Sequence, residues 1–84
     1  MPLSATDKLL RDRIENDFSY HPPRGDQPKR YQNIRDEAKA LALLIIELCP
    51  DCRERSLALT KLEECVMWAN AGIARAEQSA PPAQ

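Results

Sequence analysis

The chain has 84 residues, of which 43% are hydrophobic and 30% are charged, and its formal net charge is −1. This length predicts one domain near the lower limit for independent folding, so self-association is expected to supplement a small core. The balanced charge argues against binding along a long nucleic acid, which requires an excess of cations, but it permits a small anionic ligand.

Segments that would direct the chain to a membrane or out of the cell are not expected. The longest wholly apolar run, residues 40–46, is far shorter than the ~20 residues needed to cross a bilayer. The N-terminal "MPLSATDKLLRDR" has no apolar segment typical of a secretory signal. Three cysteines, an odd number, fit a reducing compartment better than a disulfide framework. These features predict a cytoplasmic protein without a membrane partner.

The first predicted element is a short helix over residues 4–17, capped by Ser4 or Thr6. Its apolar stripe is narrow and is formed by Leu9, Leu10 and Ile14. A loop follows, "FSYHPPRGDQPKRY" at 18–31, which combines aromatic rings, prolines and cations.

A second helix is predicted over about 28–48, with Asp26 as N-cap and Pro28 in the first turn, where the missing N–H costs nothing. Its apolar residues recur at alternating spacings of three and four, which indicates one continuous seam. The seam consists of Tyr31, Ile34, Ala38, Leu41, Ile45 and Leu48.

The sequence "CPDCRE" interrupts this pattern, since Pro50 disfavours helical geometry at Cys49. Asp51 and Glu54 have the spacing of a capping box, so a third helix is predicted over about 52–77. Its predicted seam is Leu59, Leu62, Val66, Ala69 and Ile73. Two long helices joined by so short a turn must run antiparallel. The expected fold is therefore all-α, a short N-terminal helix plus a helical hairpin, in one domain at 1–78 with a flexible tail at 79–84.

The hairpin carries more apolar side chains than one inner face can bury. The surplus lies beside the two seams and comprises Leu43, Leu44, Ile46, Leu57, Cys65, Met67 and Trp68. An exposed apolar surface of this size indicates a partner. We therefore predict a homo-oligomer with Trp68 at or near the subunit contact; the alternative is that Trp68 packs under the first helix within a monomer.

Enzymatic and metal-binding chemistry finds little support in the sequence. The "CPDC" turn invites a redox or zinc interpretation, but a CxxC redox motif normally follows a strand, and none is predicted. Cys65 lies thirteen residues beyond Cys52, or roughly 20 Å along a helix, too far to share a metal. His21 is accompanied by no nucleophile motif, and no glycine-rich phosphate loop is present. Neither catalysis, a metal nor a cofactor is expected.

The loop and the start of the second helix have the composition of a site for a small polyanion. Residues 24–35 contain four cations, among them Arg30 and Arg35, and one carboxylate. Tyr20 and Tyr31 offer faces on which bases can stack, and Arg side chains bind phosphate oxygens in a planar geometry. The competing interpretation is that Tyr20 and the prolines only fasten the first helix to the hairpin.

Four segments resemble the phage-encoded anti-CBASS sponge proteins: "FSYHPPRGDQ", "RYQNIRDEAKALA", "CPDCRERSLALTKLEE" and "VMWANAGIAR". The resemblance runs from about Phe18 to Arg75. It implies a compact homohexamer in the host bacterial cytoplasm. Such a protein sequesters cyclic oligonucleotide messengers of bacterial immunity without cleaving them, so the effector stays inactive and immunity is evaded.

The resemblance also implies two kinds of ligand site. The expected site for cyclic dinucleotides such as cGAMP comprises Tyr20, His21, Pro22, Arg30 and Arg35, with Tyr20 stacking on a base and one of the two arginines neutralising phosphates. The expected site for cyclic trinucleotides comprises Thr60, Asn70 and Arg75. The alternative function is a helical protein-interaction adaptor that uses the apolar face and the Pro-rich loop; a thiol redox protein using Cys49 and Cys52 is a weaker third.

Overall fold

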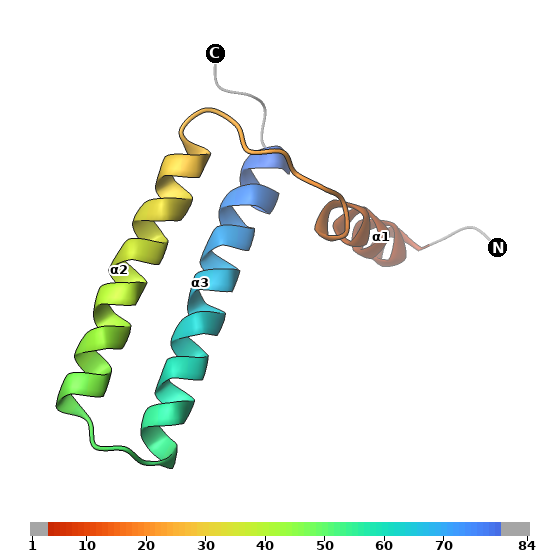
Figure 1. Ribbon diagram of the computed structural model, residues 1–84. Coiled ribbons are helices and arrows are strands. Elements are labelled where there is room, and N and C mark those ends of the chain that lie inside the picture. Colours follow the sequence, from red (N-terminus) through yellow and green to blue (C-terminus); the bar gives the residue numbers. More distant parts are fainter. Residues whose placement is uncertain (1–3, 80–84) are drawn as a thin grey trace.

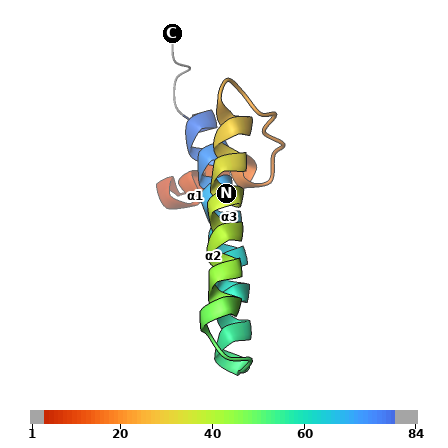
Figure 2. The same ribbon diagram turned by 60° about the vertical axis from the view of Figure 1, so that its left-hand side comes forward.

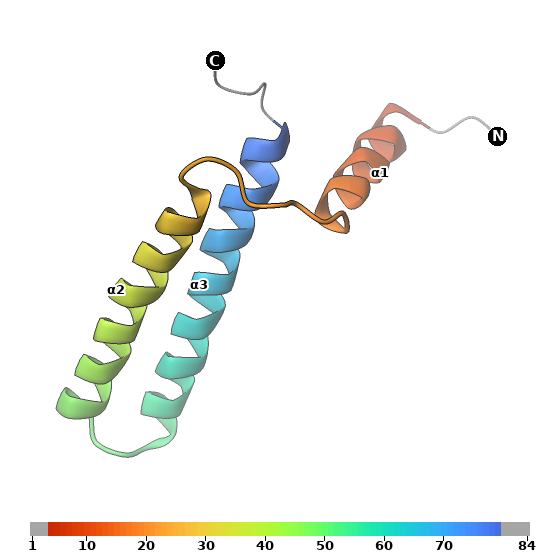
Figure 3. The same cartoon turned by 45° about the horizontal axis from the view of Figure 1, so that its top comes forward.

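The computed structural model describes residues 4–79, which form three helices and no strand: α1 (Ala5–Asp17), α2 (Gln27–Leu48) and α3 (Arg53–Ser79). α2 and α3 run antiparallel as a long hairpin, and α1 lies beside the C-terminal end of α3, without contacting α2 (Figures 1 and 3). The predicted all-α class and hairpin are confirmed. The predicted tail, 79–84, lies outside the described residues except for Ser79 at the end of α3.

Local contacts mark where the helices begin. The Ser4 side chain caps α1, since its Oγ accepts a hydrogen bond from the N–H of Asp7 at 3.1 Å. Asp26 occupies the N-cap position of α2 but makes no capping hydrogen bond, and its carboxylate instead lies 3.1 Å from Arg30. At α3 the predicted cap is displaced by one residue: the helix begins at Arg53, and Cys52, not Asp51, offers its carbonyl oxygen to the N–H of Ser56.

The register of the α2–α3 seam departs from the predicted one in the second half of α2. Leu41 and Leu48 are exposed at 46% and 74%, and the half-buried positions beside them are Ala42 and Cys49. On α3, Ala69 is exposed and Asn70 takes the half-buried position. A helix with 3.6 residues per turn drifts away from a strict seven-residue repeat, so the inward-facing line shifts by one residue after two or three turns.

The hairpin is a single layer of helices, and it encloses no core. Figure 2 shows α2 and α3 nearly edge-on as one thin slab, and the shortest principal extent of the Cα trace is 15 Å. Among residues 4–77 no hydrophobic side chain is buried, and thirteen large ones are exposed, including Trp68 at 64% and Met67 at 66%. Because Trp68 is so open, α1 does not cover it.

No helix in the described part of the chain is both long enough and apolar enough to cross a membrane.

Candidate ligand site at the interhelical loop

The loop between α1 and α2, residues 18–26, presents two aromatic rings to solvent. Phe18 is 87% exposed and Tyr20 is 83% exposed. At the far end of the loop Gly25 has φ +55°, a left-handed conformation that residues with a Cβ rarely adopt, and this lets the chain turn into α2. The loop therefore displays the face of Tyr20 without burying it.

His21 helps to fasten the start of this loop. Its Nε2 lies 2.8 Å from the carbonyl oxygen of Asn16, so this nitrogen donates the hydrogen bond. The Asn16 side chain in turn donates to the carbonyl oxygen of Arg75 at 3.2 Å, and the Arg75 guanidinium lies 3.7 Å from Asp17. His21 and Arg75, predicted for two different sites, are thus connected through the end of α1.

The end of the loop and the start of α2 converge on one carboxylate of α3. Both terminal nitrogens of Arg30 donate to Glu77, each at 2.7 Å, and Gln27 Nε2 donates to Glu77 Oε1 at 2.8 Å. The Arg24 guanidinium donates to the carbonyl oxygen of Glu77 at 2.9 Å, and the Arg24 N–H donates to Gln27 Oε1 at 2.9 Å. Among residues 4–77 only Gln27 is buried, at 5% exposure.

This cluster changes the ionisation of its members. Hydrogen bonds from Arg30 and then Gln27 lower the pKa of Glu77 to about 2. The same hydrogen bond to Glu77 raises the pKa of Arg30 above its usual range, while burial opposes the rise. Both groups remain charged at neutral pH, and a bidentate guanidinium–carboxylate pair fixes direction as well as distance.

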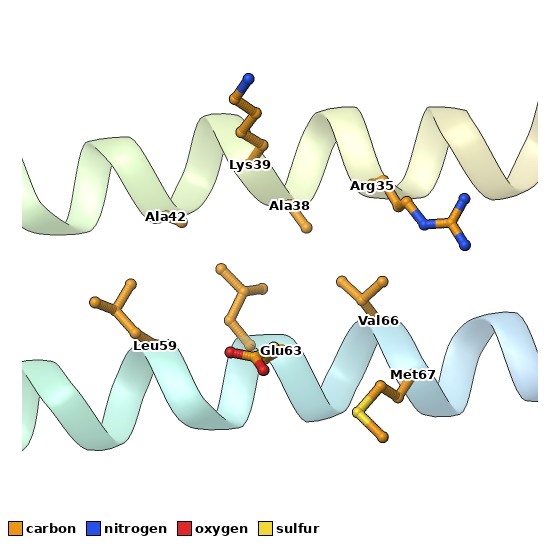
Figure 4. A pocket seen from close by; sticks show the side chains of 9 residues that line it. Arg35, Ala38, Lys39, Ala42, Leu59, Glu63, Val66 and Met67 are labelled. Atoms are coloured by element: carbon orange, nitrogen blue, oxygen red, sulfur yellow. The ribbon is translucent and has the colours of Figure 1, made fainter.

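Arg35 lies one and a half turns further along α2 and remains open. Its side chain is exposed and makes no hydrogen bond or ion pair within the described residues. It lines one end of an apolar groove of about 440 Å³ between α2 and α3, where Ala38 and Ala42 face Leu59 and Val66 (Figure 4). Leu62, Lys39, Glu63 and Met67 complete the lining. A phosphate can therefore approach Arg35 without breaking an existing pair.

The residues expected for cyclic trinucleotides occupy different surroundings along α3. The Thr60 hydroxyl is exposed and donates to the carbonyl oxygen of Ser56 at 3.1 Å. Asn70 is half-buried, and its Oδ1 is buried with no hydrogen-bond partner. An unpaired buried carbonyl oxygen is costly, so Asn70 Oδ1 is an acceptor that a further donor would satisfy. Arg75 lies at the opposite end of α3 from Thr60, so one protomer does not bring the three together.

The turn between α2 and α3, which contains Cys49 and Cys52, is held by hydrogen bonds to the neighbouring helices. The N–H of Cys49 donates to the carbonyl oxygen of Ile45 at 2.8 Å, and its carbonyl oxygen accepts from Arg55 at 3.4 Å. Burial, followed by the neighbouring Cys52, raises the pKa of the Cys49 thiol, which disfavours the reactive thiolate. Within residues 4–79 no three His, Cys, Asp or Glu side chains are grouped closely enough to hold a metal.

Sequence reasoning missed the residues that fasten the loop: Asn16, Arg24, Gln27 and Glu77. The contacts of these residues with α3 join positions at least 47 apart in the sequence, and such contacts leave no local pattern. A local signal existed only for Arg30, whose spacing from Asp26 is that of a helical ion pair. The unusual charge pattern of the loop indicated that this region could bind a ligand, but it did not indicate that Glu77 on α3 is the partner of these residues.

The chain is thus an all-helical hairpin of one layer, with an aromatic loop anchored beside the C-terminal end of α3. Residues 11–74 match the Acb2/Tad1 hairpin domain, and the chain belongs to this family. This is the anti-CBASS sponge family, and membership implies a role as a sponge for cyclic nucleotides. No curated protein and no solved structure matches the chain.

Proposed function

We propose that the protein binds cyclic di- and trinucleotide messengers in the host bacterial cytoplasm and holds them intact, which keeps CBASS effectors inactive. The observation that carries this proposal is the family match over residues 11–74. The loop supports it independently, because an exposed tyrosine and an open arginine provide the stacking face and the cation that a base and a phosphate require. Sequestration needs no catalytic group, and the protein is proposed to be a binding protein and not an enzyme.

The cyclic dinucleotide site is proposed at the loop and the first turns of α2. Tyr20 stacks on a base, while His21 and Pro22 hold the loop beside it. Of the two arginines, Arg35 is favoured as the phosphate ligand, because the guanidinium of Arg30 already serves Glu77 and Asp26. A phosphate would have to displace two short hydrogen bonds to recruit Arg30, and no such exchange is needed at Arg35.

The cyclic trinucleotide site is proposed to be assembled from several protomers. Thr60, Asn70 and Arg75 are spread over four turns of α3, which is about 22 Å of helix, so copies must contribute different members of the set. The unsatisfied Oδ1 of Asn70 supports this arrangement, since an exocyclic amine of a base is a donor that would pair with it.

We propose a homo-oligomer, because the described residues enclose no core, and a hexamer in particular, because the family resemblance implies one. A slab 15 Å thick with thirteen exposed large apolar side chains gains its stability when a second layer covers it. Trp68 and Met67, on the open face of α3, are proposed contacts between protomers. Aromatic residues and methionine are enriched in such interfaces.

The proposal is tested by calorimetric titration of the full chain with a panel of cyclic di- and trinucleotides, together with sedimentation velocity. The expected result is heat of binding with at least one member of each class and a sedimenting species several times the mass of one chain. If no member of the panel binds at micromolar protein, the sponge function is wrong. An adaptor would give that null titration together with a stable complex with another polypeptide.

A further inference from the structure

We propose that Glu77 is a positioning residue for the ligand loop: its carboxylate and backbone oxygen hold residues 24–30 so that the loop presents Tyr20 in its binding orientation. The effect on ligand binding rests on the proposed function. The effect on the conformation of the loop concerns the ligand-free chain alone and is the structural half of the inference. Neither of the two expected ligand sites includes Glu77. This residue also lies beyond the segment that matches the family, residues 11–74.

The first support is the number and direction of the contacts at this one residue. Glu77 accepts hydrogen bonds from Gln27 and twice from Arg30 through its carboxylate, and from Arg24 through its backbone oxygen. These donors come from the last turn of the loop and the first turn of α2. The end of the loop is therefore held to Glu77 by three different residues, of which Gln27 is buried at 5% exposure.

The second support is the position of the other anchor. The entry to the loop is tied to α3 by Asn16, whose side chain donates to the carbonyl oxygen of Arg75 at 3.2 Å. Arg75 and Glu77 are two residues apart on α3, about 3 Å along its axis. One turn of α3 thus holds both ends of a nine-residue loop (Figures 1 and 3).

The consequence for Tyr20 follows from its exposure. At 83% exposed, the ring is not held by packing, so its placement depends on the two anchors and on the fixed φ of Pro22 and Pro23. A ligand that stacks on Tyr20 must otherwise order the loop itself, which reduces the net affinity. Releasing the Glu77 anchor is therefore expected to weaken binding although Glu77 does not touch the ligand.

The test compares the full chain with Glu77→Ala, Glu77→Gln and a control variant, Glu47→Gln. Alanine has the highest helix propensity, so α3 is preserved, and glutamine retains an acceptor oxygen for Gln27 and Arg30. Glu47 is an exposed carboxylate near the other end of α2, so the control removes the same charge away from the loop. Each protein is treated with trypsin without ligand, with cleavage sites assigned by mass spectrometry, and is then titrated with cGAMP and with the cyclic dinucleotide that the wild-type chain binds best.

Trypsin reports the loop directly, because the Arg24–Gly25 bond lies within it and the Lys39–Ala40 bond lies in the middle of α2. For Glu77→Ala we expect cleavage after Arg24 to accelerate at least fivefold, with cleavage after Lys39 unchanged. We also expect the dinucleotide Kd to rise about tenfold. Glu77→Gln is expected to fall between this variant and the wild type, and Glu47→Gln is expected to behave as the wild type in both assays.

Unchanged cleavage after Arg24, or an unchanged Kd, in Glu77→Ala would overturn the inference. Parallel acceleration after Arg24 and Lys39 would also overturn it, because Glu77 would then stabilise the fold as a whole. If the wild-type chain binds cyclic trinucleotides but no cyclic dinucleotide, the proposed dinucleotide site and the ligand half of the inference fail, while the sponge function stands. The trypsin result would still decide the structural half by itself.

Discussion

Removal of the Tyr20 ring is the most informative single perturbation of the proposed dinucleotide site. With 83% of the residue exposed, Tyr20→Ala removes little packing within the protomer, and the fold is expected to tolerate it. A tyrosine side chain offers roughly 200 Å² of surface, and a base stacked on one face covers about half of it. At ~25 cal/mol per Å² this contact contributes roughly 2.5 kcal/mol, within the ~1–3 kcal/mol measured for bases stacked on aromatic residues.

A loss of about 2.5 kcal/mol corresponds to a roughly 70-fold increase in Kd, and the full range spans about 5- to 150-fold. Calorimetry with a cyclic dinucleotide measures the change, and sedimentation velocity verifies that the oligomer is intact. Phe18→Ala is the matched control, because Phe18 belongs to the same loop and is 87% exposed. An unchanged Kd for Tyr20→Ala, or an equal loss for Phe18→Ala, would refute the stacking role of Tyr20.

Four further predictions address other parts of the molecule. Arg75→Ala is expected to abolish cyclic trinucleotide binding while dinucleotide binding persists; Asp17→Asn breaks the same ion pair, so an equal trinucleotide loss in that variant would assign the effect to α1 docking. Trp68→Lys places a charge on the open face of α3 and is expected to dissociate the oligomer, and an unchanged sedimentation coefficient would remove Trp68 from the interface. Gly25→Ala meets no neighbouring atom within 4 Å but retains φ +55°, so it is expected to cost about 1 kcal/mol and to lower Tm by about 4–8 °C; no change in Tm would show that the loop relaxes to another conformation. The pKa of Glu77 is lowered to about 2, so its contribution to stability is complete above the ordinary carboxylate pKa and is lost as pH falls toward 2. The Tm difference between wild type and Glu77→Gln should therefore vanish over that pH interval. A Tm difference that stays constant with pH would contradict this prediction.

The arrangement of the helices follows from local rules and was accessible from the sequence. Ser4, one of the two predicted caps, caps α1; Pro28 lies in the first turn of α2, and Pro50 separates the two long helices. Each of these signals acts over three or four residues. The existence of an antiparallel hairpin then follows from the length of the turn alone.

The seam was predicted less accurately, because a heptad pattern does not specify where a straight helix drifts from it. The exposure of Leu41 and the inward position of Ala42 depend on how α3 lies against α2, which periodicity in one helix does not encode. The same reason applies to Asn70, a polar residue in a half-buried position next to an apolar line. Polar residues at such positions contradict local pattern, and they are frequent where a protein binds something.

The composition of the loop indicated a candidate site, but the sequence did not predict how its side chains are arranged. Tyr20 and Arg35 were identified by their chemistry, and the structure finds both exposed. The sequence did not show which of Arg30 and Arg35 is already engaged in an ion pair. That difference depends on Glu77, which lies 47 residues beyond Arg30 and reaches it only when the hairpin closes. Long-range ion pairs of this kind have no periodic signature in the sequence.

Copies of this hairpin are proposed to assemble around cyclic oligonucleotides and to retain them unaltered. A retention experiment tests this: the protein is incubated with a mixture of cyclic di- and trinucleotides, the unbound fraction is removed by filtration, and the bound fraction is released by heat and identified by chromatography. Intact cyclic nucleotides are expected to be recovered from an oligomeric protein. Recovery of linear products, or of nothing above a protein-free control, would contradict it.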